Sequence, residues 1–259
     1  MAPRKDKDAD LSLSEEELEQ IREDREGLEW LRDYIAESGT AETVQPVGEA
    51  SATPISQAAF DLIVEMEVSS EQVYTARYRR PIWPKEQSGV TIGIGYDVGY
   101  ATKPLLRADW QVAIADDMVK ALERAIGVTG QPAAALAQQL RAQVDVPWQP
   151  AVGVHRDKVL PRWVGLVEQH LANTGIVGPD CLGALVSLTY NRGASYGKQG
   201  DRYREMRNIA SHMTKRQFAK IPAEFRSMKR LWPHVSGLQK RREREARLFE
   251  TGLAAMPVG

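Results

Sequence analysis

The chain has 259 residues, of which 42% are hydrophobic and 27% are charged. This composition is ordinary for a globular protein and excludes a fibrous, collagen-like or wholly disordered chain. No apolar run approaches the roughly 18 residues of a membrane-spanning helix, so no stable membrane insertion is expected. A single cysteine excludes an internal disulfide framework, and the four histidines form no close ligand pair, so neither a metal nor a cofactor is expected.

Charge is distributed unevenly along the chain. Residues 1–50 hold 6 Lys/Arg and 15 Asp/Glu, a net of −9, whereas residues 51–259 hold 28 and 20, a net of +8. A cationic body is attracted to anionic polymers such as nucleic acid, a membrane surface or the bacterial cell wall. Charge alone does not choose among these three.

The acidic leader, residues 1–53, is predicted to be a helix followed by a linker, and the body is predicted to span residues 54–259. Ser14 and Glu17 have the spacing of a capping box, and apolar residues then recur at helical spacing to about Glu37. Residues 38–54 have the small, polar, Pro- and Gly-containing composition of a linker. The leader is either a solvated helix on a tether or an element for docking or delivery.

The beginning of the chain lacks the apolar stretch of a secretory signal. We therefore expect the protein to be made in the cytoplasm. If it acts outside the cytoplasm, another device must carry it there.

The body is predicted to be mostly α within the α+β class. Ser56 is expected to cap a helix that runs to about Ser70, and Val90–Tyr96 is the only convincing strand. The remainder is expected to be helical over residues 107–127, 132–144, 158–173, 180–192, 201–211, 214–227 and 238–251.

Glu67 stands out in the first helix of the body. It falls on the apolar stripe formed by Phe60, Ile63 and Val64, whereas Glu65 falls nearer the polar side. Burial disfavours an ionised carboxylate and raises its pKa, and a raised pKa suits a general acid. The alternative is a glutamate at the edge of the stripe, in water or paired with an arginine.

Glycines alternate with bulkier residues in the segment SGVTIGIGYDVGY, residues 88–100. Glycine weakens a strand, so this pattern indicates turning or close backbone approach, as in a hairpin that lines a cleft. Thr91, Tyr96 and Asp97 are its polar members. The Lys-Ser/Thr of a phosphate-binding loop is missing, and here the helix precedes the strand.

Together these segments resemble the lysozymes of bacteriophage type, glycoside hydrolase family 24. In that family a catalytic Glu ends the first helix, a Tyr follows seven residues later, and a T-I-G-x-G hairpin comes next, an order matched by Glu67, Tyr74 and residues 91–95. ALVSLTYNRGASY (184–196) and GLQKRREREARLFETG (237–252) resemble two later family segments. The resemblance implies a lysozyme-like fold with a small β-hairpin and a helical remainder, and it implies that Glu67 is catalytic.

The chain also departs from the family pattern. Ala76 stands where the family has an Asp or Cys, an insertion includes residues 77–87, and Tyr96 replaces a histidine. The second carboxylate therefore cannot be carried over by position. Asp97 is the first candidate because it is the nearest acidic residue on the β element, and Glu86 is the second.

The implied reaction is hydrolysis of the glycosidic bond between N-acetylmuramic acid and N-acetylglucosamine. Glu67 would protonate the leaving oxygen, while a second carboxylate activates water or stabilises the transition state. Thr91 could orient the attacking water, and Ser88 is a weaker candidate for the same task. The residues expected to contact substrate are Ser88, Tyr96, Trp83, Tyr190, Asn191 and Arg192. Trp83 could instead pack within its loop, and Asn191 could cap a helix next to Gly193.

Competing interpretations remain open. Residues 200–252 carry 14 Lys/Arg and 6 Asp/Glu, but the charges are mixed and no nucleic-acid motif accompanies them, so a solvated face or attraction to the wall is favoured over nucleic-acid binding. The histidines and Cys181 are expected to be surface or packing residues.

Alternative functions are a peptidoglycan amidase or a non-catalytic wall-binding module. The resemblance implies a phage endolysin or a secreted antibacterial effector that acts in the periplasm or on the wall, with peptidoglycan strands as the partner and a possible immunity or delivery protein.

Overall fold

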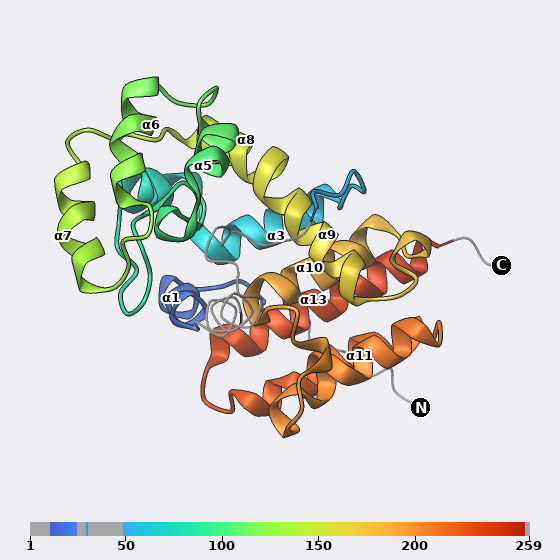
Figure 1. Ribbon diagram of the computed structural model, residues 1–259. Coiled ribbons are helices and arrows are strands. Elements are labelled where there is room, and N and C mark those ends of the chain that lie inside the picture. The colour runs from blue at the N-terminus through green and yellow to red at the C-terminus, as the bar shows by residue number, and fades with distance from the viewer. Residues whose placement is uncertain (1–10, 25–29, 31–48, 257–259) are drawn as a thin grey trace.

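The computed structural model describes residues 11–24, 30 and 49–256. Over these residues the protein is mostly helical with one two-stranded antiparallel sheet, which agrees with the predicted mostly-α class. The elements in Figure 1 are α1 (Glu15–Glu23), α3 (Gln57–Val68), α4 (Glu71–Val73), β1 (Thr91–Ile92), β2 (Tyr96–Asp97), α5 (Lys103–Trp110), α6 (Asp116–Leu122), α7 (Gln131–Leu140), α8 (Trp148–Val154), α9 (Leu160–His170), α10 (Pro179–Arg192), α11 (Arg204–Thr214), α12 (Ile221–Ser227) and α13 (Ser236–Ala254).

Helix α10 is the centre of the core. Nearly all of its residues are buried, because apolar or small side chains surround the whole helix rather than one face. It packs against α13, α3 and α9, and α12 covers another side of α13. Figure 1 shows α5–α8 grouped at one end of the molecule and α11–α13 at the other, with α1 between the two groups.

Helix α3 begins and ends close to the predicted limits. The Ser56 hydroxyl accepts a hydrogen bond from the Ala59 amide at 3.1 Å, which satisfies one of the free N–H groups of the first turn. The helix ends at Val68 because Ser69 has φ 64° and ψ −71°, which no helix accommodates. Glu67 therefore lies in the last turn.

Residues 91–97 form the predicted hairpin, although its extended part is two short strands and not one strand over Val90–Tyr96. Thr91 pairs with Asp97 and Ile92 with Tyr96, so each strand has only two residues. Gly93 and Gly95 have φ values of +56° and +69°, a conformation that L side chains rarely adopt, and they form the turn between the strands. A β-carbon on Gly93 would also lie 2.7 Å from the Trp110 ring.

Two of the predicted helices, over residues 107–127 and 214–227, are interrupted; in the second range α11 ends at Thr214 and α12 begins only at Ile221. The prediction of one helix over residues 107–127 is wrong, because α5 ends at Trp110 and α6 begins only at Asp116. Before α9, five residues (His155–Val159) form a π-helical turn that joins it to α8. The C-terminal helix α13 extends slightly beyond the predicted range at both ends.

The leader helix α1 packs against the body. Its predicted capping box is confirmed: the Glu17 amide donates to the Ser14 hydroxyl at 3.2 Å and the Ser14 amide to the Glu17 carboxylate at 3.0 Å. Leu18 and Ile21 are 3% and 2% exposed and belong to the main core, so this part of the leader is not a solvated helix. The prediction of one helix up to about Glu37 is wrong at Asp24, which is extended and ends α1. Most of the later part of that range and most of the predicted linker lie outside the described residues.

Candidate functional site

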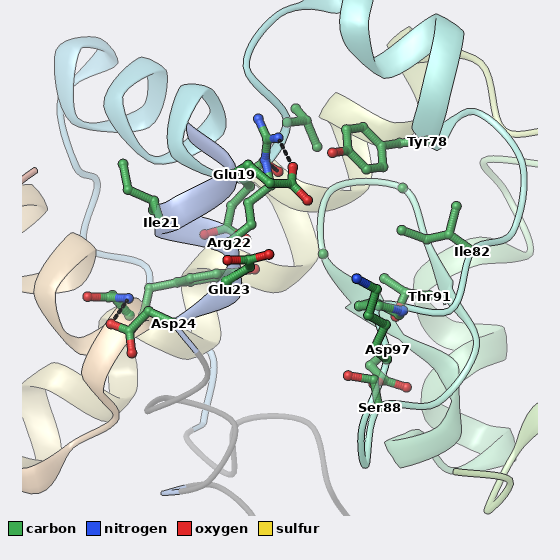
Figure 2. Close-up of a pocket in the computed structure, with 18 of the residues that line it drawn as sticks. Glu19, Ile21, Arg22, Glu23, Asp24, Tyr78, Ile82, Ser88, Thr91 and Asp97 are labelled. Atoms are coloured by element: carbon green, nitrogen blue, oxygen red, sulfur yellow. Dashed lines mark hydrogen bonds and ion pairs between the residues drawn. The ribbon is translucent and has the colours of Figure 1, made fainter. Parts of the chain in front are cut away.

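A cavity of ≈ 630 Å³ lies between α1, the end of α3, the segment from Tyr78 to Tyr100, and parts of α9, α10 and α13. Figure 2 shows Arg22 and Glu23 on α1 facing Thr91 and Asp97 of the hairpin. The sequence-predicted residues that line this cavity are Glu67, Asp97, Thr91, Ser88, Trp83, Glu86, Tyr190 and Asn191. They come from three separate parts of the chain, and the fold brings them to one space.

Glu67 is half-buried at the cavity wall, beside Tyr190 and Gly95. A β-carbon placed on Gly95 would lie 3.0 Å from the Tyr190 hydroxyl and 3.4 Å from Glu67 Oε2, so both groups flank the same glycine. Burial, followed by the charge of Glu67, raises the pKa of Tyr190 well above its ordinary value. The phenol therefore stays protonated near the carboxylate. Glu65 has a different role, since both of its carboxylate oxygens accept from Arg244, at 2.8 and 2.7 Å.

Asp97 ties the hairpin together. Its Oδ2 accepts from the Gly89 amide and its Oδ1 from the Gly99 amide, both at 2.9 Å. Two backbone donors stabilise the ionised carboxylate. A β-carbon on Gly89 would lie 2.3 Å from Asp97 Oδ1, so the glycine is needed for this close approach. The arrangement holds a negative charge at the cavity wall.

Three further predicted residues, Ser88, Trp83 and Thr91, line the same cavity as Asp97. Ser88 is buried, and its carbonyl accepts from the Trp83 indole N–H at 3.0 Å, which orients the half-buried Trp83 at the wall. The buried Thr91 hydroxyl lies 3.5 Å from the Gly89 carbonyl, a long hydrogen bond. The Trp83 ring thus combines packing within its loop with a place on the cavity wall.

Tyr96 and Arg192 do not line the cavity. The Tyr96 hydroxyl donates to Asp109 Oδ2 at 3.0 Å, and its ring meets that of Trp110 edge-on at 5.5 Å. Arg192 is fully buried, donates to the Arg202 carbonyl at 3.0 Å and lies 5.1 Å from the Trp232 ring centroid. Both side chains hold the core together, so the structure offers no support for their predicted contact with substrate.

The leader contributes a wall of this cavity that sequence reasoning missed. The wall residues on or next to α1 are Glu19, Ile21, Arg22, Glu23 and Asp24. Asp24 Oδ2 accepts from the Asn191 side-chain amide at 3.3 Å, which links the leader to the end of α10. The amphipathic pattern of the leader reveals an apolar face but contains no signal for the surface that it covers.

Buried charges lie behind the cavity on α13. Arg241 lines the cavity, and its Nε donates to Glu245 Oε1 at 3.2 Å. Arg242 donates to the same oxygen at 3.1 Å and to Asn191 Oδ1 at 2.9 Å. Burial lowers the pKa of Arg242 to about 10. The expectation of a solvated face or a face toward the wall is wrong for these two arginines, which are at most 1% exposed.

The remaining candidates for chemistry are packing residues. His155 is buried against Phe60 and Tyr190, with ring centroids 6.2 and 5.9 Å away. Cys181 is buried, and burial raises the pKa of its thiol to about 12. Among residues 11–24, 30 and 49–256, no group of three or more His, Cys, Asp and Glu side chains is arranged to hold a metal. No described helix is both long and apolar enough to span a bilayer.

Comparison with known protein families finds a match for part of the chain. A family model described as a domain of unknown function (DUF8812) matches residues 62–147. The match covers under half of the chain, from within α3 through the hairpin to the segment after α7, and it includes Glu67, Thr91 and Asp97. No curated protein matches the chain.

Proposed function

We propose that the protein is a glycoside hydrolase that cleaves the bond between N-acetylmuramic acid and N-acetylglucosamine in peptidoglycan. The observation that carries this proposal is that two carboxylates from separate elements, Glu67 and Asp97, line one cavity of ≈ 630 Å³. Paired carboxylates at the two sides of a scissile bond are the usual apparatus for glycoside hydrolysis. The resemblance of Glu67, Tyr74 and residues 91–95 to the phage-type lysozyme pattern supports the same reaction, whereas the assignment of Asp97 rests on its place at the cavity.

In this proposal Glu67 is the general acid. It lies half-buried at the end of α3, beside Tyr190, and in this role its carboxylic acid donates a proton to the leaving oxygen. In the same proposal, the amides of Gly89 and Gly99 hold the Asp97 carboxylate in place. It acts as the base for water or stabilises the oxocarbenium-like transition state.

Digestion of purified peptidoglycan tests the proposal. Wild type should produce new reducing muramic-acid ends, and Glu67→Gln should produce none, as read by mass spectrometry. Asp97→Asn removes the charge but also loses one of the two hydrogen bonds from backbone amides, because an amide NH2 cannot accept from an N–H group. A thermal melt of this variant, run beside the assay, separates loss of the charge from loss of the hairpin. Cleaved stem peptides would indicate an amidase, and wall binding without products would indicate a non-catalytic module. Either result would refute the glycosidase.

The proposed substrate places the site of action at the cell wall, reached by a secretion machine or a phage pore. Expression of the chain with a periplasmic export signal should then lyse a Gram-negative host, whereas cytoplasmic expression should not. Equal tolerance of both would contradict wall hydrolysis. For an effector, a producing cell would also require an immunity protein that covers the cavity.

A further inference from the structure

We infer that Arg22 of the leader helix is a positioning residue for Glu67, so that α1 is a working part of the active site. This inference rests on the proposed function for its catalytic consequence. Its structural basis is independent of that function, since it concerns how the end of α3 is held.

The end of α3 adopts a conformation that needs external support. Ser69 has φ 64° and ψ −71°, and the Ser70 amide donates to the Val68 carbonyl at 2.9 Å. These values describe a γ-turn with positive φ, which is rare and strained for a residue with a β-carbon. Such a turn persists only where its surroundings fix it, and this one begins directly after Glu67.

Arg22 provides that support from the leader. Its Nε donates to the Glu67 carbonyl at 3.0 Å, and its Nη2 donates to the Ser69 hydroxyl. Its Nη1 donates to Glu19 at 3.1 Å, and the guanidinium lies 5.6 Å from the Tyr78 ring centroid. The planar guanidinium is a rigid fork that reaches both sides of the turn at once, which a lysine cannot do.

The helix that carries Arg22 is fixed to the body. The Gly237 amide donates to Gln20 at 3.3 Å, and Lys240 forms an ion pair with Glu17 at 2.8 Å. A β-carbon on Gly237 would lie 2.2 Å from the Glu17 carbonyl oxygen, so this surface of α13 fits the helix backbone closely. Arg22 thus acts from a rigid element.

The cavity volume indicates that α1 forms one wall of the cavity and does not fill it. The ≈ 630 Å³ remain with α1 in place, within the range of about 300–1,000 Å³ that is typical of ligand sites. An inhibitory segment would instead fill this space. We therefore expect α1 to support hydrolysis rather than block it.

Kinetics of the full chain test the inference. Arg22→Ala should lower kcat about 10- to 100-fold with KM changed less than about threefold, because the acid is misplaced while the rest of the cavity lining remains. Arg22→Lys should recover part of this loss. Glu15→Ala is the matched control. Glu15 is also on α1, but it lies outside the cavity, where it forms an ion pair with Arg77 at 3.9 Å. Its replacement should leave kcat and KM unchanged. A full kcat in Arg22→Ala, or a higher kcat, would overturn the positioning role.

Amide hydrogen exchange gives a readout that does not depend on activity. Arg22→Ala should lose protection at residues 67–70, whereas Glu15→Ala should not. Unchanged protection in Arg22→Ala would refute the clamp itself. If the wild-type protein hydrolyses no wall polymer but Arg22→Ala still loses protection at residues 67–70, the proposed function fails and the structural inference stands.

Discussion

At the scale of single residues, Gly95 lies beside the proposed acid, Glu67. It is exposed at the hairpin turn with φ +69°, and a β-carbon there would meet the Tyr190 hydroxyl and Glu67 Oε2. Gly127 offers a comparison, since it has φ +73° and nothing lies within 4 Å of the point that a β-carbon would occupy. Both glycines therefore need a positive φ, but only Gly95 has other side chains close to the position of a β-carbon.

We predict that Gly95→Ala and Gly127→Ala each lose about 1–2 kcal/mol of unfolding free energy, the cost of left-handed backbone for an L residue. Only Gly95→Ala should lose activity, because its methyl group crowds the carboxylate. Thermal melts and the peptidoglycan assay on both variants check this. Full activity in Gly95→Ala would show that substrate does not approach Glu67 across this glycine.

At the scale of elements, α10 and α13 are joined by buried charges as well as by apolar packing. Glu245 is fully buried and accepts from Arg241, Arg242 and the Ser187 hydroxyl, the last at 2.7 Å. Two buried cations therefore depend on one carboxylate. Removing one member of such a group leaves uncompensated buried charge, which costs far more than losing an ion pair at the surface.

Glu245→Ala should accordingly lower the unfolding free energy by about 3–5 kcal/mol. Glu250→Ala, on the same helix, removes a half-exposed partner of Arg226 and should cost about 1 kcal/mol or less. Chemical denaturation of both variants measures the difference. Similar losses in the two would mean that Glu245 does not compensate the buried arginines.

The same elements show what the sequence can predict. Helices α3, α10 and α13 lie within a few residues of their predicted ranges because Ser56, Pro179 and the apolar periodicity mark them locally. The hairpin turn follows from alternating glycines. The residues predicted around Glu67 do meet at one cavity, although their chemical roles stay predictions.

Structural features that depend on contacts between residues far apart in the sequence could not be predicted. Arg241 and Arg242 sit among glutamates in sequence and suggest a solvated or wall-facing surface, but Ser187 and Asn191 of α10 enclose them. The place of α1 depends on Gly237, more than 200 residues away. The π-helical turn at His155–Val159 carries no local sequence signal that we can identify.

At the scale of the whole molecule, stability should depend on pH through His155. Burial lowers the pKa of His155 from 6.5 to about 3. Between these values the unfolded chain binds a proton that the folded protein does not, so stability falls as pH drops from 6.5. The pKa values of Glu205 and Glu243 are lowered to about 2 despite burial, by hydrogen bonds chiefly from Arg230 and Lys229 respectively, and they add a further loss below pH 4.5.

We predict that His155→Phe removes the slope between pH 6.5 and 4.5, which for one group reaches at most about 1.4 kcal/mol per pH unit. The phenyl ring suits a site beside Phe60 and Tyr190. Denaturation across this pH range measures it, with the exposed His234→Gln as a control that keeps the slope. An unchanged slope in His155→Phe would mean that other groups control acid stability.

The charge of the cavity opposes that of the body around it. Residues 51–259 carry a net +8, whereas the cavity lining holds six carboxylates and three cations. Half of those carboxylates, on Glu19, Glu23 and Asp24, come from the leader. On the proposed function, the body would attract an anionic wall, and the cavity would favour segments of glycan without carboxylates.

This opposition predicts the effect of Glu23→Gln, which removes one leader charge from the cavity wall. At low ionic strength the variant should lower KM about two- to fivefold for fragments with free stem-peptide carboxylates, because one repulsive charge is lost. Fragments with amidated carboxylates should show no change in KM. In 1 M salt the KM difference between the variant and wild type should vanish, because the screening length is then about 3 Å.

Glu16→Gln, exposed on α1 but outside the cavity, is the control. An equal change in Glu16→Gln would assign the effect to the overall charge of the leader, whereas a change confined to Glu23→Gln would show that leader carboxylates select substrate at the cavity itself.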